Sequence, residues 1–202
     1  MKIYLIIEHN NMMNEAELLE NNGIVEKEQL FQKIKHTIQE KITKDDIVSL
    51  RTNSGNTQQT ERNNIDMIRR VLDEMGLSYQ EAGSQQSKDF RNVGGIGLNL
   101  EIKKTDSFHI YFNDTCPSDD IKYIIFYTGT NYKKKTNIPP KILFINGEEF
   151  LNFTEEWLPN FKRKLEELLN EYARGENKKK LGGILEVYPR PTYKADISKL
   201  IL

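Results

Sequence analysis

The sequence predicts an α/β fold, in which helices flank one central β-sheet. Two amphipathic segments with helical spacing precede a run of strand-like segments, and a third helical segment follows them. The chain has 202 residues, a length that favours a single domain around one core. It contains no internal repeat, no long low-complexity tract and no evident linker. We therefore expect residues 1–202 to form one domain.

The N-terminal part of the chain is expected to form a strand and two helices. Residues 2–7 are apolar and end in an acid, which favours a buried strand because the run is too short to cross a membrane. Helices are expected over about 26–42 and 58–76, with a polar turn at 44–46 and a short apolar run at 47–50 between them. Their apolar stripes are Leu30, Phe31, Ile34, Ile38 and Ile42 in the first, and Ile65, Ile68, Leu72 and Met75 in the second.

Strand-like segments occupy the middle of the chain. Alternating or continuously apolar residues predict strands at 77–82, 96–103, 108–112, 121–127 and 142–145. A long helix is then expected over about 148–172, where Pro159 could interrupt it. The residues after this helix include Pro189 and Pro191 and are expected to be irregular.

The distribution of charge is more informative than its total. A net charge of −1 argues against a protein that binds nucleic acid by bulk positive charge alone. However, residues 121–146 contain five lysines and no acid, and residues 172–202 contain seven bases and three acids. Two basic segments in a near-neutral chain suit a groove for a polyanion on one side of the molecule. Solvated surface loops explain each segment equally well.

Cysteine content and targeting features exclude several classes of protein. Cys116 is the single cysteine, so a disulfide framework and a multi-cysteine zinc site are excluded. The N-terminus lacks the small-residue cleavage site of a signal peptide. We therefore expect a cytoplasmic protein that does not associate with membranes.

Three charged residues in the middle of the chain have the spacing of a catalytic site. Asp89 is followed by eleven residues and then by Glu101, Ile102 and Lys103. Side chains alternate between the two faces of a strand, so Glu101 and Lys103 are expected side by side on the face opposite the apolar residues. The pair Gly94-Gly95 predicts a tight reversal that brings Asp89 back beside Glu101.

This combination of residue types suits metal-assisted cleavage of a phosphodiester. Two carboxylates close together repel each other, and a hard cation such as Mg²⁺ relieves the repulsion through oxygen ligands. The cation can activate water and stabilise charge on a phosphate, and a lysine beside it can offset the charge that develops. We therefore expect Asp89 and Glu101 to bind Mg²⁺ and Lys103 to act with them.

Two other segments contain an acid two residues before a lysine. Glu176-Asn177-Lys178 lies in a polar turn, where a solvated loop is the simpler explanation. Asp120-Ile121-Lys122 lies at the start of a strand but has no apolar strand before the acid. Only the set of Asp89, Glu101 and Lys103 combines an upstream acid, a glycine reversal and an alternating strand. The alternative for this set is a surface strand with one charged face.

The two acids are expected on consecutive strands that follow an amphipathic helix. This arrangement, Asp89-x11-Glu101-x-Lys103, resembles the PD-(D/E)xK nuclease superfamily. Within the superfamily it is most similar to type II restriction endonucleases. Lys88 stands where the named motif has proline. The resemblance covers about residues 58–146, which would form the catalytic core of a single nuclease domain, with a helical C-terminal part over 148–202. It implies a central mixed β-sheet flanked by helices, Mg²⁺ as the cofactor, and a homodimer that cuts double-stranded DNA at a short specific sequence.

The resemblance also suggests one accessory residue. Many members of the superfamily place a glutamate near the metal on the helix that precedes the catalytic strands. Glu61 has that place here, one turn before Ile65. The alternative is an acid that stabilises the N-terminus of a helix.

Several polar residues are candidates for contacts with DNA. Strand residues can reach base edges in the major groove, and lysines or polar loops can contact phosphates or bases. Local hydrogen bonding or a solvated loop is the alternative for each of them. The candidates are His109, Tyr111, Asn113 and Asp114 after the catalytic strand, Lys133, Lys134 and Lys135 in a basic loop, and Ser54, Asn56, Gln85 and Gln86 in polar loops.

Two other functions remain compatible with the same residues. A structure-selective nuclease, such as a Holliday-junction resolvase or a repair nuclease, would use the same three catalytic residues with fewer base-reading loops. A non-catalytic DNA-binding module would retain a nuclease-like sheet without cleaving DNA. Cleavage of long DNA into discrete fragments would indicate the restriction endonuclease. Preferential cleavage of branched DNA would indicate the structure-selective nuclease, and no cleavage at all would indicate the binding module.

Overall fold

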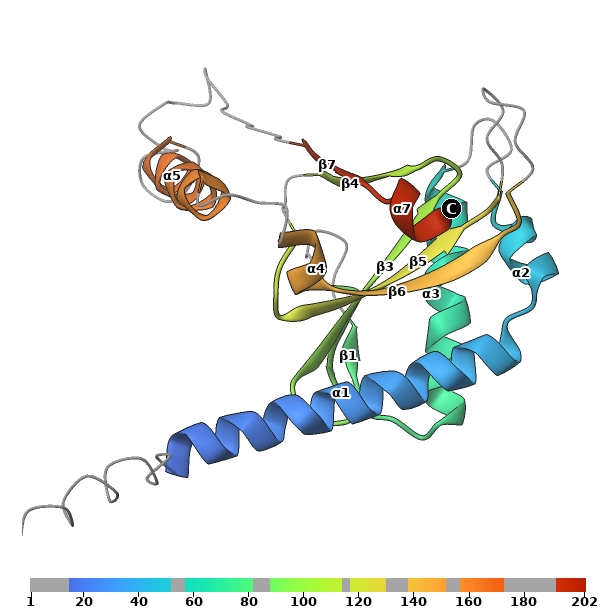
Figure 1. The fold of residues 1–202 in the computed structure, drawn as a ribbon, viewed down its shortest axis with the longest axis horizontal. Helices are drawn as coiled ribbons and strands as arrows, with labels where there is room; N and C mark the ends of the chain where they lie inside the picture. Colours follow the sequence, from blue (N-terminus) through green and yellow to red (C-terminus); the bar gives the residue numbers. More distant parts are fainter. Residues whose placement is uncertain are drawn as a thin grey trace, which may run out of the picture.

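The computed structural model describes residues 15–51, 57–81, 88–113, 117–129, 138–151, 157–172 and 192–202. Its described part is a mixed α/β fold built on a five-stranded sheet with helices around it (Figure 1). The helices are α1 (Glu15–Lys41), α2 (Lys44–Ser49), α3 (Thr57–Glu74), α4 (Gly147–Leu151), α5 (Trp157–Tyr172) and α7 (Ser198–Ile201). The strands are β1 (Gln80–Glu81), β2 (Phe90–Val93), β3 (Leu98–Thr105), β4 (His109–Asn113), β5 (Ile121–Tyr127), β6 (Lys141–Asn146) and β7 (Thr192–Asp196). The predicted α/β class with a central mixed sheet is confirmed.

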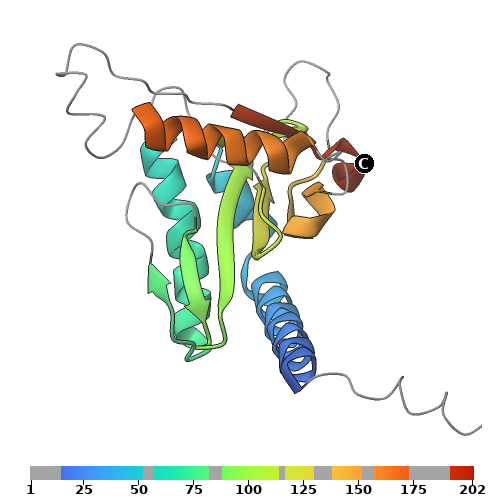
Figure 2. The same cartoon turned by 90° about the vertical axis from the view of Figure 1, so that its left-hand side faces the viewer.

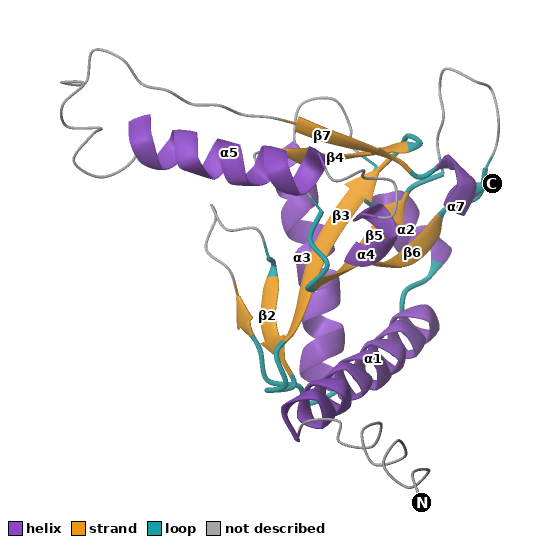
Figure 3. Cartoon of the chain, turned by 60° about the vertical axis from the view of Figure 1, so that its left-hand side comes forward, coloured by secondary structure: helices purple, strands orange, loops and turns teal. Residues whose placement is uncertain are grey.

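The main sheet has the strand order β1-β2-β3-β5-β6. The neighbours β1–β2, β2–β3 and β5–β6 are antiparallel, whereas β3 and β5 are parallel. Between β3 and β5 the chain leaves this sheet, and β4 pairs antiparallel with β7 in a separate two-stranded sheet. Figure 3 shows the β4–β7 pair lying across the end of β3. One end of β3 is therefore next to both sheets.

One face of the main sheet is covered by α1 and α3 (Figure 2). The apolar stripes expected for these helices pack against every second side chain of the sheet, which buries both surfaces from water. The cluster includes Phe31, Ile34 and Ile38 of α1, Ile68, Val71 and Leu72 of α3, and Phe90, Leu98, Leu100, Ile102, Ile124 and Phe126 of the sheet. The charged residues of β3 must then point to the opposite face.

The opposite face is covered over β5 and β6 by the β4–β7 pair together with α4 and α7. This second cluster contains Ile110 and Phe112 of β4, Tyr123, Ile125 and Tyr127 of β5, Ile145, Phe150, Ala195, Ile197 and Ile201. Strand β5 is thus buried on both faces, as its continuous apolar sequence predicted. Strand β3 is less covered on this side, and its polar side chains lie beside the second sheet.

The turn between β2 and β3 depends on glycine. Gly94, Gly95 and Gly97 have φ values of 69°, 75° and 75°, in the left-handed region that favours glycine. At Gly94 a Cβ atom would lie 2.6 Å from Cδ2 of Leu30, so the close approach of α1 also requires glycine there. The predicted reversal at Gly94-Gly95 is confirmed, and it returns β3 antiparallel alongside β2.

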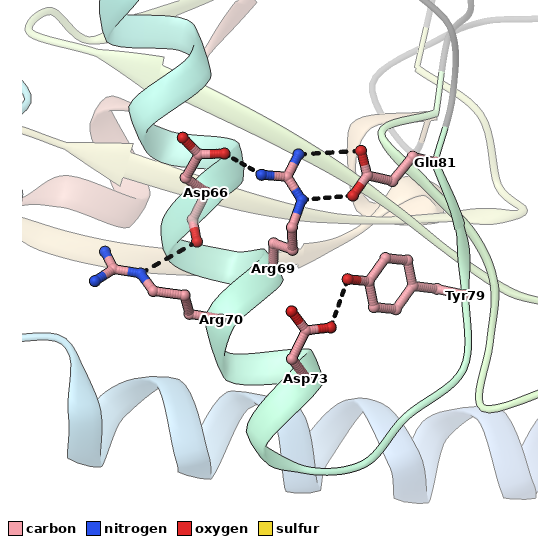
Figure 4. A network of polar contacts seen from close by, with 6 residues as sticks. All are labelled: Asp66, Arg69, Arg70, Asp73, Tyr79 and Glu81. Carbon is pink, nitrogen blue, oxygen red and sulfur yellow. Dashed lines mark hydrogen bonds and ion pairs between the residues drawn. The ribbon is translucent and has the colours of Figure 1, made fainter.

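A network of polar contacts joins α3 to the strand that follows it (Figure 4). Arg69 forms ion pairs with Asp66 on its own helix and with Glu81 on β1, and its Nη2 donates to Oε2 of Glu81 at 3.0 Å. The Tyr79 hydroxyl donates to Oδ1 of Asp73 at 2.6 Å. Burial, together with this bond, raises the pKa of Tyr79 to about 12. These contacts fix α3 against the first strand of the sheet.

The N-terminal elements differ from the sequence prediction in extent. Helix α1 begins at Glu15, eleven residues before the expected start at 26, and the strand expected at 2–7 lies outside the described residues. The polar turn expected at 44–46 is instead the first turn of α2. The reason is a capping box, in which Thr43 accepts from the Asp46 backbone and Asp46 accepts from the Thr43 backbone.

The C-terminal part was predicted less well. The single helix expected at 148–172 is two helices, α4 and α5, and the residues between them lie outside the description. Pro159 does not interrupt α5, because it falls in the first turn, where its missing N–H costs no helical hydrogen bond. The stretch expected to be irregular contains β7 and α7. Across the described ranges, no helix combines the length and apolar character needed to cross a membrane.

Candidate active site

Asp89 lies at the edge of β3, directly before β2. The pairing of β2 with β3 ends at Phe90 and Leu100, so no further backbone of β2 reaches the following residues of β3. The Asp89 carboxylate takes that place, and its Oδ2 accepts a hydrogen bond from the Ile102 backbone N–H at 2.6 Å. A charge-assisted bond to the backbone orients the carboxylate beside Glu101, the residue before Ile102.

Glu101 and Lys103 share one face of β3. Leu100 and Ile102 are buried against the helices, while Glu101 and Lys103 are partly buried on the other face. Lys103 Nζ donates to Glu101 Oε1 at 2.6 Å, and the two side chains are 24% and 13% exposed. The same Nζ lies 5.6 Å from the centroid of the Phe112 ring. The Lys103 amine is thus held between Glu101 and β4 and not within the main core.

A pocket of about 470 Å³ contains all three residues of the predicted catalytic set. Its wall is formed by the end of β3, the turn after it, the start of β4 and the N-terminal half of α3. Besides Asp89, Glu101 and Lys103, the lining includes Asn64 of α3 and His109 and Tyr111 of β4. The structure therefore brings together the residues whose spacing in the sequence suggested a common site.

Two residues that line this pocket each have a side-chain oxygen with no hydrogen-bond partner among the described residues. The two oxygens are Glu101 Oε2 and Asn64 Oδ1, and both are buried. Buried polar atoms are normally satisfied, so these two call for a ligand. With Asp89 they provide the hard oxygen donors that Mg²⁺ prefers. The side chains present thus fit the expected cofactor.

Within the described ranges, no group of three or more His, Cys, Asp or Glu side chains is placed to hold a metal ion. The described lining holds three carboxylates, Asp89, Glu101 and the exposed Asp106 in the turn after β3. A cation bound by Asp89 and Glu101 would need further oxygen ligands.

The competing pair Asp120 and Lys122 is engaged in other contacts. Asp120 forms an ion pair with Lys88 and accepts from the Ser118 hydroxyl at 2.6 Å. Burial alone would raise the pKa of Asp120, but these two bonds outweigh it and lower the pKa below its ordinary value. Lys122 Nζ donates to Glu28 and Asn146 at 2.9 and 2.8 Å. Neither side chain lines the pocket. The other competing segment, 176–178, lies outside the described residues.

Helix α3 contributes a residue that the sequence analysis missed. The predicted accessory residue Glu61 lies on α3, but its side chain is not among those described. Asn64, on the same helix, lines the pocket. The sequence did contain an indication, because Asn64 precedes Ile68 by four residues and Val71 by seven, which are apolar positions on the same helical face. A polar residue at such a position is unusual and points to a specific partner.

Two of the predicted DNA-contacting residues line the pocket. His109 and Tyr111 belong to β4, and Tyr111 is 51% exposed. Their partners across the strand pair are Asp196 and Lys194 of β7, and Lys194 Nζ lies 5.9 Å from the centroid of the Tyr111 ring. Residues near the C-terminus therefore pair with a strand that lines the pocket, which the sequence patterns did not predict.

The other predicted DNA contacts cannot be placed. Asn113 ends β4, but its side chain is not described. The remaining candidates lie outside the described residues: Ser54, Asn56, Gln85, Gln86, Asp114, Lys133, Lys134 and Lys135. Their roles stay predictions.

Comparison with known proteins adds no independent assignment. No protein-family model, curated protein or solved structure matches the chain. The function has to be inferred from the side chains that line the pocket.

Proposed function

We propose that this protein is a Mg²⁺-dependent endonuclease of the type II restriction class, which hydrolyses phosphodiester bonds of double-stranded DNA at a short specific sequence. The supporting observation is the convergence of Asp89, Glu101 and Lys103 in one pocket at the open edge of β3. The antiparallel strands β1–β2–β3 after α3 are compatible with a restriction-endonuclease-like fold. As the sequence resemblance implies, the enzyme would act as a homodimer on DNA in the cytoplasm.

Asp89 and Glu101 are the residues that would hold the cation. Asp89 is oriented by the Ile102 N–H, and Glu101 has a buried oxygen with no protein partner among the described residues. When bound, Mg²⁺ would supply Lewis-acid stabilisation of the phosphate and a lower pKa for the attacking water. The partly enclosed pocket strengthens these electrostatic effects because it limits access of bulk water.

Lys103 would act directly on the reacting phosphate. Its amine is one hydrogen bond from Glu101 and lines the same pocket, so it can donate to the phosphate or to the attacking water. A fixed positive charge at this point stabilises the negative charge that develops in the transition state. Phe112 limits the freedom of the amine on its other side.

The decisive experiment is incubation of the protein with long unmethylated phage DNA, with and without Mg²⁺. We expect discrete fragments with Mg²⁺ and intact DNA in the presence of a chelator. The variants Glu101→Ala and Lys103→Ala should each abolish cutting while the protein stays folded. Matched controls are Glu26→Ala and Lys33→Ala, which change exposed residues of α1, on the other face of the sheet.

Other outcomes identify the alternative functions. Preferential cutting of four-way junctions over plain duplex would indicate a structure-selective nuclease that uses the same residues. DNA binding that is independent of Mg²⁺, with no cleavage of any substrate, would indicate a non-catalytic module. Full cleavage by Glu101→Ala or Lys103→Ala would remove the proposed site.

A further inference from the structure

Asn64 is a buried polar residue whose position the fold alone does not explain. It is 3% exposed and lies on α3, where the side chains four and seven residues later, Ile68 and Val71, are part of the apolar core. Its side chain reaches the same pocket as Asp89 and Glu101. Its Oδ1 has no hydrogen-bond partner among the described residues.

A buried amide oxygen without a partner destabilises a protein. An apolar side chain of similar size would pack at this position without that cost. Glu101 lines the same pocket, and its Oε2 is also buried without a hydrogen-bond partner among the described residues. Two residues of one pocket that each keep an unsatisfied oxygen are most simply explained by a single ligand that both contact.

We infer that Asn64 supplies the third protein oxygen of the divalent-cation site formed with Asp89 and Glu101. The inference rests on the proposed function, because it adds a ligand to the site already described. The amide carbonyl is an accepted ligand for hard divalent cations, alongside carboxylates and water. A neutral third ligand also leaves the site with two negative charges, which balance those of one divalent cation.

This assignment differs from the expectation raised by the sequence. Glu61 was the helix residue predicted to assist the metal, one helical turn earlier on α3. Among the described side chains of α3, Asn64 and Ile65 line the pocket, and Asn64 is the polar one of the two. The contribution inferred from α3 is thus a neutral amide oxygen, and the Glu61 side chain lies outside those described.

The test measures binding of Mn²⁺ in the absence of DNA, because Mn²⁺ shares the oxygen preference of Mg²⁺. Binding is followed by electron paramagnetic resonance, as the loss of the signal of free Mn²⁺. We expect the dissociation constant of Asn64→Ala to rise by about tenfold, the lower end of the effect of disturbing a metal site. The matched control is Asn63→Ala, an exposed neighbour on α3 that does not line the pocket. This control should bind Mn²⁺ as the wild-type protein does.

A second variant keeps the proposal testable if Asn64→Ala fails to fold. Asn64→Asp retains an oxygen at the same position and adds a negative charge, so it should bind Mn²⁺ more tightly than the wild type. A purely structural role for Asn64 would change the melting temperature without changing Mn²⁺ affinity. Wild-type affinity in folded Asn64→Ala, or unchanged or weaker binding by Asn64→Asp, would overturn the assignment.

The outcome is separable from that of the nuclease proposal. If the wild-type protein cleaves DNA with Mg²⁺ and Asn64→Ala binds Mn²⁺ normally, only the role of Asn64 is wrong. If the wild-type protein cleaves no DNA but loses Mn²⁺ affinity on substitution of Asn64, the cation site stands and the nuclease assignment fails.

Discussion

The carboxylate of Asp89 accepts a hydrogen bond from the backbone N–H of Ile102, at 2.6 Å. This bond joins the residue before β2 to the middle of β3, at the point where the backbone pairing of the two strands ends. A side chain thus takes the place of a strand partner. The same carboxylate is thereby positioned beside Glu101 in the pocket.

Two substitutions of Asp89 should separate structure from catalysis. Asp89→Ala removes the bond to Ile102 and should lower the free energy of unfolding by about 1.5–3 kcal/mol, the range for a hydrogen bond to a charged group. Asp89→Asn keeps an acceptor oxygen but loses the charge, so it should be nearly as stable as the wild type and cut no DNA. Urea unfolding and a fragment assay measure the two effects. Normal cleavage by Asp89→Asn would show that its charge is not needed.

The ion pair of Glu101 and Lys103 should depend on the metal. Without divalent ions, Lys103→Met leaves the mostly buried Glu101 carboxylate uncompensated and should destabilise the protein by about 1–3 kcal/mol. Mg²⁺ should reduce that loss, because it neutralises the same carboxylate. The double variant Glu101→Gln with Lys103→Met should be more stable than Lys103→Met alone.

Melting temperatures with a chelator and with Mg²⁺ would test this prediction. An equal loss in both conditions would mean that no cation reaches Glu101.

The glycine turn before β3 offers a pair of matched substitutions. Gly94 and Gly95 both have positive φ, so alanine at either should cost about 1–2 kcal/mol of backbone strain. At Gly94 the added Cβ would also meet Leu30, whereas at Gly95 the nearest atom within 4 Å is Ser78 Oγ at 4.0 Å. Gly94→Ala should therefore be the more destabilised of the two by chemical denaturation. Equal losses would show that Leu30 moves aside without cost.

Asp120 should stabilise the protein in a defined pH range. The pKa of Asp120 is lower in the folded state than its ordinary value of 3.8. The contacts of its charged form therefore stabilise the fold above pH 3.8. This stabilisation is lost as the pH falls through the folded-state pKa. The stability difference between the wild type and Asp120→Asn should be constant above about pH 5 and shrink under more acidic conditions. Urea unfolding across this range measures the difference.

The same variant tests the competing motif. Asp120→Asn should still cleave DNA, because Asp120 does not line the pocket. Loss of cleavage in a protein with normal Mn²⁺ binding would assign Asp120 a role in catalysis.

The β4–β7 pair should contact DNA beside the pocket. Lys194 lies next to Tyr111, which lines the pocket, so Lys194→Ala should weaken DNA binding and reduce the slope of log affinity against log salt by about 1. Tyr111→Ala should weaken binding with little change in that slope. Fluorescence anisotropy without Mg²⁺ measures both. The control is Lys199→Ala on α7, an exposed lysine that should leave affinity unchanged.

Local sequence patterns predicted the structural features that depend on residues close together in the chain. The helical spacing in α1 and α3 and the alternation in β3 identified which side chains face the core. That alternation, with the glycine reversal, also predicted that Asp89, Glu101 and Lys103 would lie close together. These features follow from backbone geometry over a few residues, because the periods of a helix and a strand determine the direction of each side chain.

The sequence by itself thus determined the α/β class and the three residues of the candidate site. Only the tertiary structure decided that β4 leaves the main sheet to pair with β7, that Asn64 enters the pocket, and that Asp120 and Lys122 bind Lys88 and Glu28. Each of these depends on contacts between residues far apart in the chain, such as His109 opposite Asp196. Such contacts are selected by the packing of the whole core, because no local period specifies which distant partner a strand or side chain will meet.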